Sequence, residues 1–272
     1  MGGRGSSSSG GGGGGGISSM NQLKNFSKAT ESFNPNTVTP PSMQDIAKGN
    51  VTPKGGVAFS DFKTMTDDEK ADVIAKALMV KPPIFLDDSG LQRLAYFTGM
   101  SDKPQIVSDS QLDKMAGKSI YRNVHDSYNS RTDIGYSSKD IYKQIASGDF
   151  TMYSDSGGSV HGKAIYFASN YSSASMYMSG KNNIMMRAKI SPNAKTISES
   201  QLNTLVRQEA NKNSKLYRAC QNAGSSSNMM IALAKGYDVV IDDRGSGYNM
   251  VLNRGALVMS DTTKPTTYGG NW

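Results

Sequence analysis

Hydrophobic residues recur at helical spacing in the first half of the chain and at strand spacing in the second half. Residues 66–69 form a capping box, which predicts the start of an amphipathic helix that ends before Pro82. Shorter helices are predicted over residues 90–97 and 110–116, the latter with Ser108 in capping position. We expect order to begin near Thr66 and these three helices to pack together as a small cluster.

Alternating apolar and polar positions dominate the second half of the chain. Strands are expected over residues 119–124, 183–190, 237–241, 248–253 and 256–259, and short helices over residues 137–148, 198–206 and 225–234. Residues 198–201 form a capping box at the start of the second of these helices. Helices first, then strands interleaved with helices, and finally adjacent strands favour an α+β domain with mainly antiparallel sheets. The lack of a strand, a GxGxxG turn and a helix in succession argues against a Rossmann dinucleotide site.

Composition divides the chain into four segments. Residues 1–60 are rich in Gly and Ser and are predicted to be a disordered tail, because burial cannot offset their ordering entropy. We expect a helical subdomain over residues 61–117, the main domain over residues 118–261 and a flexible C-terminus over residues 262–272. This length is enough for one domain with a sizeable core.

Charge and residue usage exclude several classes of protein. The net charge of +7 comes without a dense stripe of Lys and Arg, so a dedicated nucleic-acid reader is not expected. Cys220 is the only cysteine, and the histidines are His125 and His161, so neither an intrachain disulfide nor a metal site is expected. The chain has no apolar run of about 18 residues, and we therefore expect a protein of the cytoplasm without a membrane segment.

Residues 161–177 carry the most suggestive pattern in the chain. A Gly-containing turn leads into a short aromatic and aliphatic strand, and a helix follows that Ser172 or Ser173 could cap. Tyr166 and Tyr177 flank the start of this helix and could hold a flat ring between two phenol faces. The alternative is a buried strand that leads into an ordinary helix.

The same residues resemble a signature block of the ADP-ribosyltransferases. Gly162, Ile165, Tyr166 and the downstream Tyr177 match the second block of the poly(ADP-ribose) polymerase and diphtheria-toxin branch. Ala164 stands where a second Gly is usual. The resemblance implies a core of two mainly antiparallel sheets with short helices, and it makes residues 118–261 the catalytic domain.

Residues 119–124 resemble the first-strand block of this family. Arg122 occupies its basic position, where a guanidinium can bind phosphate or ribose oxygens with two hydrogen bonds. Asn123 replaces the customary Gly and brings a side chain to a place where backbone would approach the ligand. The alternative for Arg122 is a strand residue at the surface in an ion pair.

Residues 245–253 resemble the third block, in which most family members carry a Glu. The last Glu of the chain is Glu209, and Tyr248 stands nearest to the expected position. Asp242, Asp243 and Glu209 are alternative acids, although the sequence of the two aspartates is typical of a turn and Glu209 is expected on a helix. Without the Glu, we expect transfer of a single ADP-ribose rather than chain elongation.

The resemblance implies a mono-ADP-ribosyltransferase with NAD⁺ as co-substrate and no metal. Nicotinamide is expected between Tyr166 and Tyr177, and the reaction depends on orientation and electrostatics rather than on many acid–base groups. The implied catalytic residues are Arg122, Tyr166 and Tyr248. The implied NAD⁺-binding residues are Arg122, Asn123, Gly162, Tyr166, Ser173 and Tyr177.

The opening of the chain adds a second resemblance. Residues 2–5 and the Gly/Ser run that follows are similar to the start of ADP-ribosyltransferase-like proteins encoded with bacteriophage head genes. This similarity implies a phage-encoded monomer that acts in the host cytoplasm on a protein or nucleic-acid acceptor, with association with the phage head or packaging in the virion as a further option. Two alternatives stay open: a catalytically inactive virion component with the same fold, and a basic RNA-binding protein.

Overall fold

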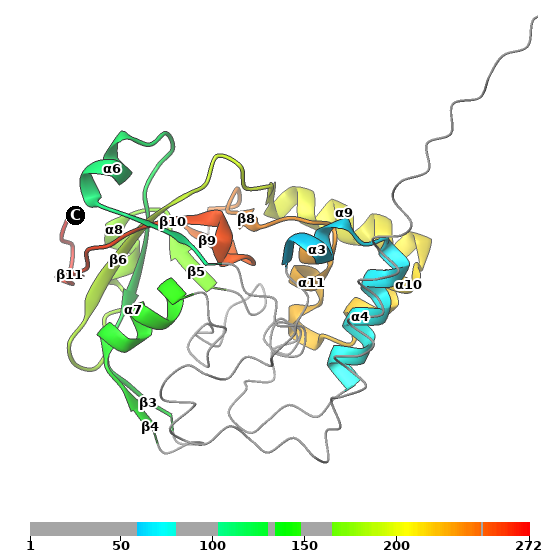
Figure 1. Ribbon diagram of the computed structural model, residues 1–272, viewed down its shortest axis with the longest axis horizontal. Helices are drawn as coiled ribbons and strands as arrows, with labels where there is room; N and C mark the ends of the chain where they lie inside the picture. The colour runs from blue at the N-terminus through cyan, green and yellow to red at the C-terminus, as the bar shows by residue number, and fades with distance from the viewer. Residues whose placement is uncertain (1–58, 80–102, 130–133, 148–164, 246) are drawn as a thin grey trace, which may run out of the picture.

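The computed structural model describes residues 59–79, 103–129, 134–147, 165–245 and 247–272. Within these ranges a large mixed sheet is accompanied by several helices, an architecture compatible with the α+β class (Figure 1). Of the tail expected over residues 1–60, the structure describes Phe59 and Ser60, which begin a helix. Described order therefore begins before Thr66.

The helices gather in two places (Figure 1). Helices α3, α4, α9, α10 and α11 lie at one end of the sheet, whereas α6, α7 and α8 lie around its other part. Their bounds are α3 Phe59–Thr64, α4 Asp67–Met79, α6 Asp109–Lys114, α7 Ser138–Ser147, α8 Tyr171–Ser175, α9 Glu199–Lys212, α10 Lys215–Gln221 and α11 Ser227–Ala234, with the 3-10 turns η1 Gly224–Ser226 and η2 Arg254–Ala256.

Capping boxes begin α4, α6 and α9, as the sequence predicted. At α4 the Glu69 carboxylate accepts from the backbone N–H of Thr66 at 2.7 Å, and the Thr66 hydroxyl accepts from the N–H of Glu69 at 3.3 Å. Ser108 and Ser198 start α6 and α9 with the same reciprocal pair of bonds. Each box satisfies two N–H groups that a helix start would otherwise leave without an intrahelical acceptor.

Among the described residues, nine strands form the main sheet in the order β1-β10-β6-β2-β5-β9-β8-β7, with β11 beside β6, while β3 and β4 form a separate pair. Most neighbours are antiparallel; β1 with β10 and β7 with β8 are parallel. The strands are β1 Gln105–Val107, β2 Ile120–Val124, β3 Ser127–Asn129, β4 Ile134–Tyr136, β5 Ile165–Ala168, β6 Ile184–Ile190, β7 Thr196–Ser198, β8 Val239–Ile241, β9 Tyr248–Val251, β10 Leu257–Ser260 and β11 Lys264–Pro265.

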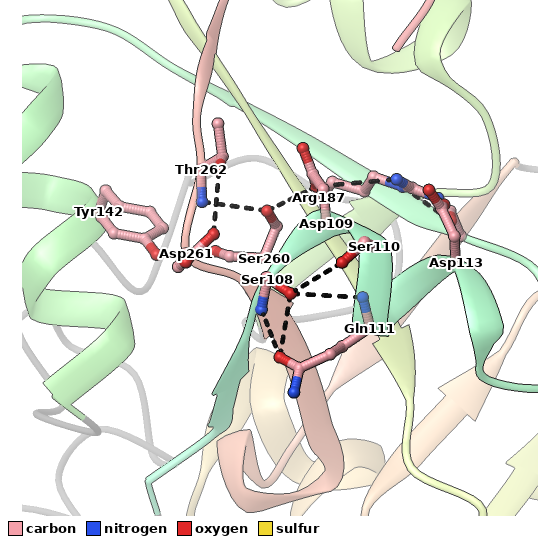
Figure 2. A network of polar contacts seen from close by, with 11 residues as sticks. Ser108, Asp109, Ser110, Gln111, Asp113, Tyr142, Arg187, Ser260, Asp261 and Thr262 are labelled. Carbon is pink, nitrogen blue, oxygen red and sulfur yellow. Dashed lines mark hydrogen bonds and ion pairs between the residues drawn. The ribbon is translucent and has the colours of Figure 1, made fainter.

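A polar network fastens α6 to the main sheet (Figure 2). The buried Arg187 of β6 forms ion pairs with Asp113 and with Asp109, the latter at 3.7 Å. Asp109 also accepts from the Ser260 hydroxyl at 2.7 Å, and the backbone carbonyl of Ser260 accepts from the Tyr142 hydroxyl at 2.7 Å. Helix α6 is therefore joined to β6, β10 and α7.

The expected cluster of three N-terminal helices differs from the structure. Helix α4 packs against α10, while β1 and α6 pack against β10. Each of these two helices packs against an element that comes later in the chain, and α4 and α6 therefore do not form one cluster. The helix expected over residues 90–97 lies outside the described residues.

Strand alternation sends side chains to two cores. Ile165 and Phe167 of β5 pack with Ile141 and Ile145 of α7 on one face of the sheet. Tyr166 faces the other side, where the helices α4, α10 and α11 bury a second and larger cluster. Successive residues of a strand point to opposite faces, so β5 contributes to both layers.

The C-terminus was expected to be flexible beyond residue 262, and this expectation is wrong for the described chain. Lys264 and Pro265 form β11, which pairs with β6 at Met185 and Ile184. The Trp272 ring lies 4.7 Å from the Lys264 ammonium and 5.6 Å from the Arg187 guanidinium. Pairing and cation–π contacts give this polar, Gly-rich segment an ordered path that its composition did not predict.

Candidate functional site

The three sequence blocks lie on adjacent strands of the main sheet. The first block is β2, the second runs through β5 into α8, and the third is β9; β5 pairs with both β2 and β9. The register aligns Tyr121 with Ala168 and Ala168 with Tyr248, so these residues form one row across three strands. Residues separated by more than a hundred positions in the sequence are thereby brought together.

Arg122 lies near the place where β2 and β5 are joined. Within these described strands, β2 pairs with β5 at Tyr121, whereas it pairs with β6 along all of Ile120–Val124. The half-buried Arg122 side chain donates from Nη1 to the backbone carbonyl of Tyr166 at 2.9 Å. The guanidinium therefore binds the backbone of the second block, which fixes the position of its positive charge.

Asn123 is held by hydrogen bonds on both sides of its amide. Its Nδ2 donates to the carbonyl of Tyr177 at 2.9 Å and to Oδ1 of Asn183 at 3.0 Å. Its Oδ1 accepts from the Thr266 hydroxyl at 2.6 Å. The side chain that replaces the usual Gly thus binds the loop after α8, a role that the sequence did not indicate.

The cap of α8 is Asn170, and the expectation of Ser172 or Ser173 as the cap is wrong. The side-chain Oδ1 of Asn170 accepts from the backbone N–H of Ser173 at 2.7 Å. Ser173 is then the third residue of the helix, and its half-buried hydroxyl faces the third block, where Gly247 lies close by. Asn is among the residues preferred at the N-cap position, so the sequence also offered Asn170 as the cap of this helix.

Tyr177 and Tyr248 form an edge-to-face pair. Their ring centroids are 5.4 Å apart with an interplanar angle of 89°. Tyr177 is 58 % exposed, whereas Tyr248 is half-buried and its hydroxyl donates to the carbonyl of Ser173 at 3.5 Å. Burial raises the pKa of Tyr248, and the neighbouring hydroxyl of Tyr177 adds to the rise. Tyr248 is therefore protonated at neutral pH.

Tyr166 has different surroundings from Tyr177. Its half-buried ring packs against the large cluster beneath α11, on the same face of the sheet as Met250. Tyr177 lies on the loop after α8 with Tyr248. The structure thus brings Tyr248, Tyr177 and Ser173 into one group, and it ties Tyr166 to Arg122 through the backbone. Gly162 lies outside the described residues.

The alternative acids serve turns and ion pairs. Asp242 accepts from the backbone N–H groups of Arg244 and Gly247, which closes the turn before β9. Asp243 accepts from the N–H of Ser200 at the start of α9. Glu209 is 3 % exposed and pairs with two lysines of the helical end. The turn that the sequence suggested for the two aspartates is confirmed.

The described ranges contain no metal-ligand cluster, activated thiol or membrane-spanning helix. In the part of the chain that the structure describes, no group of three His, Cys, Asp or Glu side chains is placed to hold a metal ion. Burial raises the pKa of Cys220 to about 12, so its thiol is not a nucleophile at neutral pH. Among the described helices, none has the length and apolar character needed to span a membrane.

Comparisons with known proteins add no relative. No protein-family model, curated protein or solved structure matches this chain.

Proposed function

We propose that this protein is a mono-ADP-ribosyltransferase that cleaves NAD⁺ at the nicotinamide glycosidic bond and transfers ADP-ribose to a protein or nucleic-acid acceptor. One observation carries the proposal: three blocks that resemble the family occupy the adjacent strands β2, β5 and β9. Arg122 is bonded to the backbone of Tyr166, and Tyr177 lies against Tyr248. The family's core of two sheets is part of the proposal; the described strands form one large sheet and a separate pair.

The residues present fit the chemistry of this co-substrate. The nicotinamide ring of NAD⁺ is a positively charged pyridinium, which would take the electron pair of the broken glycosidic bond and leave as neutral nicotinamide while the acceptor bonds the ribose carbon. The diphosphate of NAD⁺ would serve as the anchor. The exposed ring of Tyr177 offers a face that attracts such a cation, and Tyr166 belongs to the site through the bond between its backbone carbonyl and Arg122. Arg122 supplies positive charge for phosphate or ribose oxygens. The hydroxyls of Ser173 and Tyr248 can bond an amide.

Tyr248 acts in this proposal as a hydrogen-bond partner and not as a base. A base at neutral pH needs a pKa near 7, and burial moves the pKa of Tyr248 in the opposite direction. In the described part of the third block, Tyr248 stands where chain growth would use a carboxylate to activate a sugar hydroxyl. Transfer of a single ADP-ribose follows, with orientation of the two substrates as the main source of rate.

Loss of Arg122 is the sharpest test of the proposal. Purified protein is incubated with labelled NAD⁺ and host lysate, and nicotinamide release and labelled macromolecules are measured. Arg122→Ala should abolish transfer, while Arg122→Lys keeps a charge without the two-pronged geometry and should keep a small part of it. Arg244→Ala, at an exposed turn residue, is the matched control and should keep full activity.

Circular dichroism checks that Arg122→Ala stays folded at the assay temperature, because its bond to Tyr166 is lost. Near-normal turnover by folded Arg122→Ala would remove this residue from the site. Absence of nicotinamide release and of label transfer by the wild-type protein would contradict the whole proposal.

A catalytically inactive protein of the same fold, such as a virion component, is the second candidate. One observation favours it: the Asn123 amide is engaged by Tyr177, Asn183 and Thr266, at a position where the family leaves room for the ligand. Titration of the wild-type protein with NAD⁺ separates the two candidates. Binding with nicotinamide release supports the transferase, and no binding supports the inactive protein.

The setting proposed for the enzyme follows the second resemblance. A phage-encoded monomer would act in the host cytoplasm, with association with the phage head as a further possibility. Mass spectrometry of host cells that express the chain, compared with cells that express Arg122→Ala, would identify the modified acceptor. A phage particle that carries the protein would show it in the proteome of purified virions.

A further inference from the structure

The C-terminal segment, residues 264–272, runs beside the candidate site. It starts as β11 on the edge of β6, and the backbone N–H of Thr266 donates to the carbonyl of Asn183 at 3.0 Å. Thr266 is 7 % exposed, so its hydroxyl is bonded away from solvent. The segment thus reaches the neighbourhood of Asn123 with a fixed backbone.

A chain of hydrogen bonds joins this segment to Tyr177. The Thr266 hydroxyl donates to Asn123 Oδ1 at 2.6 Å, and Asn123 Nδ2 donates to the carbonyl of Tyr177 at 2.9 Å. Asn183 completes the arrangement, since its Oδ1 accepts from Asn123 and from the backbone N–H of Ser179 at 3.0 Å. Because the Thr266 bond uses the Asn123 oxygen, it fixes which side of the amide faces Tyr177.

The rest of the segment contacts α8, the helix that carries Ser173. The N–H of Thr267 donates to the Tyr171 hydroxyl at 3.4 Å, and the N–H of Gly269 donates to the Ser175 hydroxyl at 3.3 Å. Packing is tight here: a Cβ on Gly270 would clash with the Thr267 hydroxyl and lie 3.2 Å from the Tyr171 ring. Both α8 and the loop after it therefore depend on the same segment.

We propose that the C-terminal segment is a positioning element of the candidate site, with Thr266 as its principal residue. It orients the Asn123 amide, and Asn123 then holds the Tyr177 loop so that the ring of Tyr177 stays against Tyr248. The importance of this for NAD⁺ rests on the proposed function, whereas the mechanical coupling between segment and loop does not.

Hydrogen exchange measured by mass spectrometry tests the coupling without any activity. Thr266→Val keeps the shape of the side chain and removes the hydroxyl, so exchange in residues 176–183 should be about 5-fold faster, the loss of one neutral hydrogen bond. Thr266→Ser restores the hydroxyl and should restore protection. Tyr268→Phe, which removes a hydroxyl from a ring of the same segment that is 79 % exposed, is the matched control and should leave exchange unchanged.

A variant that acts through packing covers the case in which Thr266→Val does not fold. Gly270→Ala displaces the segment by the clash described above and should also speed exchange in residues 176–183, while peptides from α9 keep their protection. Unchanged exchange of these residues in the folded variants would overturn the proposal. Faster exchange throughout the protein would overturn it as well, since the segment would then stabilise the fold in general.

Steady-state kinetics connect the coupling to catalysis. If the proposed function holds, kcat/KM for NAD⁺ should fall about 5-fold in Thr266→Val and return in Thr266→Ser. A wild-type protein without turnover contradicts the proposed function and leaves the exchange result to judge the coupling. Faster exchange with unchanged kcat/KM would overturn the positioning role.

Discussion

Two regions of the main sheet are stabilised in different ways. At the helical end, α11 buries six consecutive residues from Met229 to Ala234, and charged groups are paired beneath the surface. At the central strands that carry the candidate site, asparagine amides hold α8 and its loop by hydrogen bonds, and the exposed ring of Tyr177 lies against the half-buried Tyr248. Apolar burial resists local opening more strongly than exposed polar contacts do. The main source of stability and the candidate site thus lie in separate regions. Substitutions in the two regions should therefore affect the free energy of unfolding and the turnover to different extents.

The largest effect is expected at the helical end, from Asp238→Ala. The Asp238 carboxylate is buried and accepts from the Lys63 ammonium at 2.6 Å, the Asn253 amide at 2.9 Å and the N–H of Lys195 at 2.8 Å. Removal leaves three donors without this acceptor and should lower the free energy of unfolding by about 3–5 kcal/mol. Urea denaturation measures the loss.

Asp68→Ala is the matched control for Asp238→Ala. Asp68 is exposed in the first turn of α4, so its removal should cost about 1 kcal/mol or less. Equal losses in the two variants would show that the helical end does not depend on its buried carboxylate.

An intermediate effect is expected at the candidate site, from Tyr177→Ala. Because Tyr177 is 58 % exposed, the free energy of unfolding should change by about 1 kcal/mol or less. Turnover of NAD⁺ should fall about 10-fold, since a face for the pyridinium is lost. Tyr268→Ala, at a tyrosine that is 79 % exposed, should keep both stability and turnover. A large loss of stability without loss of turnover would reverse the comparison.

The smallest effect is expected from the pH dependence of Glu209. Burial alone would raise the pKa of Glu209, but the hydrogen bonds and charges of Lys212 and Lys235 outweigh it and lower the pKa below the ordinary value of 4.5. The ion pairs of Glu209 with Lys212 and Lys235 therefore stabilise the fold above pH 4.5, and this stabilisation is lost as the pH falls further.

The stability difference between wild type and Glu209→Gln measures this contribution. It should be about 1 kcal/mol at pH 7, because Lys212 is largely exposed to solvent, and it should shrink in urea titrations below pH 4.5. A difference that stays constant between pH 7 and pH 3 would show that the lost interaction is not ionic.

Local signals in the sequence predicted local structure. The capping boxes at Thr66, Ser108 and Ser198 each predicted a helix start that the structure has, since both partners lie within four residues. Helix α10 was missed, because Asn213 ends α9 in a left-handed conformation and Ser214 caps a new helix at once. The polar residues on both sides of Asn213 and Ser214 form one continuous pattern, which hid the end of α9 and the start of α10.

Long-range contacts limited what could be predicted of the site. The blocks around Arg122, Tyr166 and Tyr248 were found from sequence, and the structure places them on neighbouring strands. The hydrogen bonds of Asn123 could not be predicted from the sequence, because its partner Thr266 lies 143 positions later. A segment of Thr, Gly and Asn has no periodic pattern, and its order comes from contacts with β6, α8 and Asn123.

The place of the C-terminal segment has a consequence for biosynthesis. Ribosomes make this segment after every other described element, so β2, β5 and β9 emerge ahead of Thr266, which orients Asn123. The loop that bears Tyr177 would therefore gain its support later than the strands of the candidate site, once residues 264–272 have emerged as well.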